Sequence, residues 1–490
     1  METNAIINGS LYAGVAKSDI TTDFVGASIH DPLYAKALVM DDGDTKVVII
    51  AMDVVAIGGI SDVRDSFLPA LRDRIQQELG IDAQNVLVNA SHTHPAGRLL
   101  CDDSEQINRT FDAVKRALQN MAPVKVGVGV GYEDRIMINR TLKLKNGKSW
   151  TIRHANPCPP DDEVTGIGTV DPEIGILRID RLDGRPLAVV YNFACHPLMG
   201  VPGGAITANF PGFASKVIED NLGDDVMALF LQGAGGDITE VLYKDVSHPR
   251  DAEPIGTLLG LSVLKGLKNI ESVDAKLSVI SEKIELPRRT DIPERIASLQ
   301  QEQSELLASL RFTSLNIKSF LPLYIKYALN PDYPADYSYR YMHAEKIRSR
   351  DMAAMDAENR TNLEKYMSNI LAMEKLARIQ DDIATLQHHQ SLNEEAGFAP
   401  IAGEALGIKI GDCAIISSPA EILVEVGLNV KKASPHKYTF ISAFSNGYVH
   451  YGPPSSDYSD GGYEVTECLL APEWQDVFEN AAIRTLRRLK

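Results

Sequence analysis

The sequence predicts an α/β fold: a mixed β-sheet core with flanking helices, interrupted by a helical insertion. Three observations carry this prediction. Apolar, β-branched runs end abruptly in polar or glycine-rich turns, helical patterns alternate with these runs, and a long polar, helix-forming stretch separates two strand-like regions. Because α/β proteins place their sites beyond the carboxyl ends of strands, we expect functional residues in the turns that follow the runs.

Four apolar runs are predicted as buried strands. They span residues 46–53, 85–94, 187–197 and 227–237. A helical pattern follows the first run at 61–80, and another precedes the fourth run at 211–223. This alternation is the reason for expecting helices packed on the sheet.

The core is predicted to be one domain in two parts, residues 1–285 and 396–490, with a helical insertion at 286–395. Residues 321–343, rich in tyrosine and proline, are expected to form an irregular connection between the helices of this insertion. Apolar stripes at helical spacing mark those helices, through Ile296, Leu299, Leu306 and Leu310, and through Leu363, Tyr366, Ile370, Met373, Ala377 and Ile383.

Strand-like sequence returns after the insertion, at residues 407–421 and 437–451. These two strands are expected to rejoin the first sheet, and residues 472–490 are expected to close the chain as a helix.

Composition excludes some classes of function. A formal net charge of -17 repels a phosphate backbone, so no nucleic-acid partner is expected. The beginning of the chain lacks the pattern of an export signal, and no apolar run reaches the roughly 20 residues of a membrane span, which predicts a cytoplasmic protein. The five cysteines are scattered, odd in number and without a CxxC pair, so reduced thiols are expected. Oligomeric state stays open.

Two histidine motifs follow predicted strands. His92 and His94 form an HxH directly after one strand, and His196 ends another in Cys195-His196-Pro197. Neutral imidazole is a common zinc ligand, and a turn at a strand end can aim it into a cleft. Each motif alone is also typical of a histidine that satisfies backbone groups at a sheet edge.

A glycine-rich turn, residues 232–239, leaves the fourth strand. Its glycines permit close backbone approach to a ligand, although turn geometry alone also explains them. The turn lacks the lysine of a phosphate-binding loop and is not a dinucleotide fingerprint.

Taken together, these motifs resemble the neutral and alkaline ceramidase family, in the same order along most of the core. His92 and His196 match the two zinc histidines of that family. Pro419-Ala420-Glu421 is similar to its PGE segment, and residues 446–451 are similar to its N-x-Y-x-x-Y segment, which ends at Tyr451. Asn139-Arg140 resembles its NRS segment, and Tyr463 lies at the family's spacing after Tyr451.

The resemblance implies one zinc ion per chain, with His92, His196, Glu421 and Tyr451 as ligands. Such a set leaves room for water, whose pKa zinc lowers to about 7 for attack on a carbonyl. The resemblance further implies that Arg140 and Tyr463 donate to the oxygen that becomes negative. We expect His94 to lie close to the metal without binding it and to move a proton to the leaving group.

Without the resemblance, the same residues have ordinary interpretations. Glu421 fits the N-terminal acid of a helix, Tyr451 and Tyr463 fit aromatic packing in a glycine-rich loop, and Arg140 fits a surface ion pair. These alternatives stay open at the level of sequence.

The chain departs from the family pattern at several points. Thr239 stands where the family's GDVSPN segment has serine, so we interpret it as a hydrogen-bonding or shaping residue. Asn209 replaces an acid of the SDN-x-G-Y segment, which puts hydrogen-bond support of the metal ligands in doubt. The family's secreted members also carry an export signal and a carboxyl-terminal β-rich domain, and we expect this protein to lack both.

The function predicted from these residues is a zinc-dependent hydrolase that acts on an N-acyl amide, small or lipid-like. The first alternative is a metal-dependent carboxylesterase or lactonase, since the same groups serve an ester bond. The second is a non-catalytic, zinc-stabilised scaffold in which the helical insertion binds a partner.

Overall fold

The computed structural model describes residues 10–60, 62–94, 99–153, 158–223, 225–241, 247–330, 342–343, 346–348 and 351–489. It divides into two compact units: residues 1–289 with 399–490, and residues 290–398. Helices and strands are mixed within the first unit, and this confirms the predicted α/β class.

The largest sheet of the first unit is eight-stranded and mixed. In spatial order its strands are β12 (Met227–Gln232), β11 (Pro186–Phe193), β10 (Glu173–Arg181), β5 (Ala122–Tyr132), β1 (Leu11–Asp19), β2 (Tyr34–Asp41), β3 (Lys46–Met52) and β4 (Val86–Ala90). The β11–β12 and β3–β4 pairs are parallel and the other neighbours are antiparallel. The four runs predicted as strands are β3, β4, β11 and β12.

A second sheet has four strands, in the order β14 (Leu277–Leu286), β15 (Ile401–Ile410), β16 (Cys413–Ser417) and β18 (Tyr438–Ser442). The expectation that the strands after the insertion rejoin the first sheet is therefore wrong. They belong to the second sheet instead: β15 pairs with β14 in an antiparallel hairpin across the insertion, and β16 lies between β15 and β18. Their apolar side chains pack against those of the large sheet, as Ile415 and Phe440 do in a cluster with Leu38 and Val190.

Short strands form the rest of the sheet structure described. They are β6 (Met137–Asn139) with β13 (Ile238–Glu240), β17 (Glu421–Ile422) with β19 (Tyr451–Gly452), and the set β8 (Ser149–Thr151), β7 (Thr141–Leu144) and β9 (Val164–Ile167). The β6–β13 and β17–β19 pairs matter most here, because each carries residues of the candidate site.

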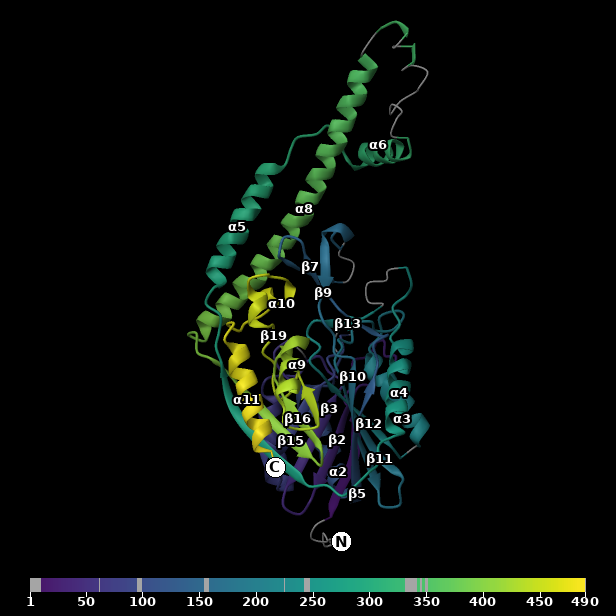
Figure 1. Cartoon of the computed structure of the whole chain (residues 1–490), viewed down its shortest axis with the longest axis vertical. Helices are drawn as coiled ribbons and strands as arrows, with labels where there is room; N and C mark the ends of the chain where they lie inside the picture. Colours follow the sequence, from purple (N-terminus) through teal and green to yellow (C-terminus); the bar gives the residue numbers. More distant parts are fainter. Residues whose placement is uncertain are drawn as a thin grey trace. The chain divides into compact units, whose positions relative to one another are not determined.

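Helices cover the two main sheets (Figure 1). They are α1 (Phe67–Leu79), α2 (Asp103–Gln119), α3 (Asn209–Leu222), α4 (Glu253–Leu267), α9 (Val424–Ala433), α10 (Tyr463–Thr466) and α11 (Trp474–Arg488), with 3-10 turns η1 (Ala83–Asn85), η2 (Asp161–Glu163) and η3 (Ser455–Tyr458). Helices α3 and α4 bury Phe210 and Leu259 in one cluster with β10–β12, and α11 buries Trp474 and Phe478 in the other main cluster. The predicted helices at 61–80, 211–223 and 472–490 correspond to α1, α3 and α11.

The second unit is helical among its described residues, with α5 (Ile292–Ser309), α6 (Ile317–Leu329) and α8 (Asp351–Glu395). The expectation of an irregular connection at 321–343 is wrong for residues 321–329, which belong to α6. Asn316 and Ser319 form a capping box at the start of α6, and Phe320 packs on Leu363 of α8, so local capping and packing outweigh the single Pro322. Residues 331–341 lie outside the described residues.

No helix in the described part of the chain combines the length and the apolar character that a membrane crossing requires. All five cysteines are free thiols, four of them buried and Cys158 exposed, as the sequence predicts.

Candidate metal and catalytic site

The four residues predicted as metal ligands come from four different segments. His92 follows β4, His196 follows β11, Glu421 begins β17 and Tyr451 begins β19. Each is at most 6% exposed. Because β17 and β19 are parallel and pair Glu421 with Tyr451, these two side chains enter the site as neighbours.

His92 is held in a backbone conformation that is rare for a residue with a side chain. Its φ of 67° lies in the left-handed region, and its amide donates to the carbonyl of Val54 over 2.9 Å. The ring donates from Nδ1 to the carbonyl of Val55 over 2.6 Å and lies 4.2 Å from the ring of Phe444. Backbone strain maintained by several contacts is typical of functional sites.

His196 is held by the glycine-rich turn. Its Nδ1 donates to the carbonyl of Gly235 over 2.5 Å, and its amide donates to the carbonyl of Ile238 over 3.0 Å. A Cβ at Gly235 would lie 2.8 Å from the nitrogen of Cys195, and one at Gly236 would lie 2.6 Å from the carbonyl oxygen of Glu421. These two glycines therefore let the turn pack against the backbone next to His196 and Glu421.

Glu421 joins the two histidines. Its Oε2 lies 3.2 Å from Nε2 of His196 and 3.5 Å from Nε2 of His92. Its Oε1 accepts a hydrogen bond of 2.5 Å from the hydroxyl of Tyr448. Burial opposes ionisation of this carboxyl, whereas His92 and His196 in their protonated forms would hold its pKa well below the usual range.

The geometry of these three side chains fits a zinc ion. Ligand bonds of about 2.0–2.2 Å in a tetrahedron place the ligand atoms roughly 3.3 Å apart, close to the separations from Glu421 to the two histidines. Both Nδ1 atoms donate to carbonyls, which leaves the Nε2 lone pairs to face the centre of the cluster. Burial also lowers the pKa of His92 and His196 to about 4, so both rings are neutral.

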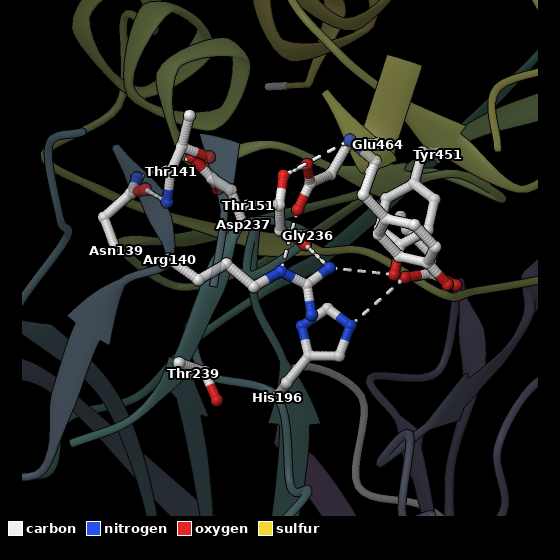
Figure 2. Close-up of polar contacts among 12 residues, drawn as sticks. Asn139, Arg140, Thr141, Thr151, His196, Gly236, Asp237, Thr239, Tyr451 and Glu464 are labelled. Carbon is white, nitrogen blue, oxygen red and sulfur yellow. Dashed lines mark hydrogen bonds and ion pairs between the residues drawn. The ribbon is translucent and has the colours of Figure 1, made fainter. Parts of the chain in front are cut away.

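Arg140 lies beside this cluster (Figure 2). Its Nε donates to Oε1 of Glu464 over 2.8 Å, and one terminal nitrogen donates to the hydroxyl of Tyr451 over 2.9 Å and to the carbonyl of Gly236 over 2.8 Å. Although burial disfavours the charged form, Tyr451 and Glu464 raise the pKa of Arg140 above its usual value. A fixed cation therefore lies in contact with Tyr451, the partner of Glu421 in the β17–β19 pair.

The other predicted site residues differ in how close they come to the cluster. The exposed His94 places Nε2 2.8 Å from Nε2 of His92, and it completes a group of three histidines that also contains His196. Tyr463 packs edge-on against Tyr451, with ring centroids 5.6 Å apart. Thr239 pairs with His196 through an isolated backbone bridge, and its hydroxyl donates to Glu240 over 3.4 Å.

Several residues that position the site were missed by sequence reasoning. Tyr448 lies inside the 446–451 segment that ends at Tyr451, and Glu464 directly follows Tyr463, so closeness in sequence to predicted site residues was the available signal. Asn89 is a polar residue within a buried strand, and its amide donates to the carbonyl of Ala443, which ties β4 to the loop after β18. Asn209, by contrast, was singled out in the sequence as the replacement of an acid, and its amide donates to the carbonyl of Pro197, which supports the His196 turn.

The fold and the site thus define an α/β protein with a buried cluster of imidazole and carboxylate groups, in which the two imidazoles follow β4 and β11 and the carboxylate begins β17. Two solved structures share the fold. A ceramidase complexed with C2 aligns with a TM-score of 0.61 and 15% identity over 97% of this chain and 75% of its own. Neutral ceramidase from Pseudomonas aeruginosa aligns with a TM-score of 0.60 and 16% identity over 99% and 75%. No protein-family model matches the sequence.

The chain therefore has a ceramidase-like fold, as the resemblance implied.

Proposed function

We propose that the protein is a zinc-dependent hydrolase that cleaves an N-acyl amide bond, small or lipid-like. One observation carries the proposal: His92, His196 and Glu421 converge at ligand spacing while the fixed cation Arg140 reaches Tyr451 beside them. A scaffold needs the ligands but gives no reason for a buried cation next to them. The ceramidase-like fold supports the same class of chemistry.

Each residue then has a distinct task. His92, His196 and Glu421 would hold the ion, and Tyr451 would complete the set. When bound, zinc lowers the pKa of a coordinated water to about 7 and polarises a carbonyl. Arg140, which is buried, would donate to the carbonyl oxygen as it becomes negative.

His94 and Tyr463 would act at the open side of the cluster. His94 is exposed while its Nε2 faces His92, so it is placed to pass a proton to a departing amine. Tyr463, less deeply buried than Tyr451, would add a second donor to the same oxygen as Arg140. Thr239 would shape the turn that carries His196.

The test is an assay of acid release by the purified chain from N-acyl amines, N-acyl amino acids, simple esters and lactones. The panel is run before chelation, after chelation and after return of zinc. Amide turnover that disappears with the metal and returns with it supports the proposal. Turnover of esters or lactones but not of amides contradicts the amidase and identifies the activity as that of an esterase or lactonase. A tightly held zinc without turnover of any substrate contradicts the hydrolase and favours the scaffold.

A further inference from the structure

Helix α6 of the helical unit has two apolar faces. One face packs on α8, where Phe320 and Tyr327 join Leu363 in a small core and the ring of Phe320 stacks 4.6 Å from that of Tyr366. The opposite face is exposed and carries five large apolar side chains at helical spacing: Ile317 (58%), Leu321 (50%), Tyr324 (46%), Ile325 (48%) and Leu329 (80%). We call this set the α6 face.

The α6 face is held in place by the packing on its other side. The capping box of Asn316 and Ser319 begins the helix, and Arg360 of α8 lies 4.2 Å from the ring centroid of Tyr327. The anchored side keeps Leu321 and Ile325 turned outward. The helix therefore presents its apolar side chains as one continuous stripe along about three turns.

The stretch of sequence that contains α6 has a net charge opposite in sign to that of the whole chain. The protein has 66 acidic and 49 basic residues, yet residues 306–330 contain Arg311, Lys318 and Lys326 and no acidic residue. Both lysines are exposed beside the α6 face. An apolar stripe bordered by lysines is the pattern of a helix that lies in the headgroup region of an anionic membrane, where lysines reach back to the phosphates.

We propose that the α6 face docks the protein on an anionic lipid surface. Phe312, in the segment just before the helix, is also an exposed large apolar residue, at 90%. A partner protein or a second copy would also cover apolar area, but an apolar helical stripe flanked by lysines matches an anionic lipid surface best. The inference does not rest on the hydrolase proposal, because lipid binding is measured without turnover.

The test is flotation of the full chain with phosphatidylcholine vesicles, with and without roughly one third phosphatidylglycerol. Binding is expected only to the anionic vesicles and is expected to weaken at high salt. The double substitution Leu321→Asp/Ile325→Asp should lower binding by roughly tenfold or more, and Lys318→Glu/Lys326→Glu by about fivefold or more per lysine.

Leu371→Asp is the matched control, because Leu371 is a leucine of the same unit with 53% exposure, on α8. It should leave binding unchanged, and circular dichroism should show equal helicity for all variants. The proposal is overturned by absent binding, by equal binding to neutral vesicles, or by an Asp double variant that binds like the unmodified chain. If the unmodified chain forms a dimer that does not bind vesicles, and the Asp double variant is a monomer, the α6 face is instead the contact with a second copy.

Discussion

Arg140 and Glu464 form a buried ion pair in which Nε of the guanidinium donates to Oε1 of the carboxylate over 2.8 Å. The pair joins the end of β6 to α10, and Glu464 also accepts a hydrogen bond of 2.7 Å from the hydroxyl of Thr151. Glu464 therefore fixes the orientation in which Arg140 reaches Tyr451.

Glu464→Gln should reduce turnover and stability together. Gln keeps an acceptor for Arg140 but leaves its buried charge uncompensated, which typically costs about 3–5 kcal/mol. Turnover should fall by about tenfold or more, measured beside zinc content and the free energy of unfolding. Glu282→Gln, which weakens an exposed pair with Arg484, is the control and should change both by little. Equal effects of the two substitutions would contradict the role of Glu464 in positioning Arg140.

Arg140→Lys should impair turnover more than substrate binding. A single ammonium cannot donate to Glu464, Tyr451 and Gly236 in the fork that the guanidinium provides. Loss of one donor to the reacting oxygen predicts a fall in kcat of about 10²- to 10³-fold. Arg178→Lys, at a partly buried arginine that pairs with Asp180, serves as the control. An unchanged kcat in Arg140→Lys would contradict the assigned role.

His196→Ala should abolish tight zinc binding. Removal of one ligand from the set should lower the metal content from one ion per chain to well below it, read by elemental analysis after dialysis. In the unmodified chain, free zinc at 100 times its Kd should stabilise the fold by about 2.7 kcal/mol. His436→Ala is the matched control, because His436 hydrogen-bonds the carbonyl of Leu486 on a different part of the unit. Equal zinc content in both variants would exclude His196 as a ligand.

His94→Asn should separate amide from ester cleavage. A departing amine needs a proton far more than the leaving group of an activated ester, so amide turnover should fall by about 10²- to 10⁴-fold and turnover of a nitrophenyl ester much less. Zinc content is measured in parallel, since His94 lies 2.8 Å from His92. Equal losses on acyl-matched substrates would rule out His94 as the proton donor.

Glu240 should make stability depend on pH. Burial raises its pKa from 4.5 to about 7, although the amides of Leu198 and Met199 donate to it. The folded state thus holds a proton that the unfolded state has lost, so the free energy of unfolding should fall as pH rises from about 4.5 to about 7, by about 3 kcal/mol. Glu240→Gln keeps the acceptor for both amides and should abolish this decrease in denaturant titrations.

Glu133→Gln gives a control of opposite sign for the pH measurement. Burial opposes ionisation of Glu133, but hydrogen bonds from Arg135 and Ser262 lower its pKa. Its contribution to stability is present at neutral pH and is lost as pH falls through its folded-state pKa. The two variants should therefore shift the pH profile of unfolding in opposite directions, and a shared direction would refute the assignment for Glu240.

Sequence reasoning recovered the strands that carry the site because these strands are buried and their apolar runs end sharply. Val86–Ala90 and Pro186–Phe193 are examples, and the histidines after them were found with them. The pairing of the later strands was not recoverable, since apolar alternation shows that a strand is half-buried but not which edge it joins. The β14–β15 hairpin, with more than a hundred residues between its strands, gives no local signal of that kind.

The supporting residues of the site were harder to predict than its candidate ligands. In the sequence, Asn89 is a single polar residue within an apolar strand. Only the structure shows that its amide donates to the carbonyl of Ala443. Glu464 is an ordinary acid in sequence, and its role depends on Arg140, which lies 324 positions away. The left-handed backbone of His92 likewise follows from tertiary contacts rather than from local preference.

Strands β14 and β15 are the two arms of one hairpin, with Leu286 opposite Ile401. In topological terms, all of the chain between these arms is a single enlarged turn. The entropy of closing a turn grows only with the logarithm of its length, so a whole helical unit can be gained or lost there without changing the order of any strand. Arg289 is buried and donates to the carbonyl of Val465, so it belongs to the first unit. A chain without the helical unit can therefore be rejoined by a short linker from Arg289 to Ala399.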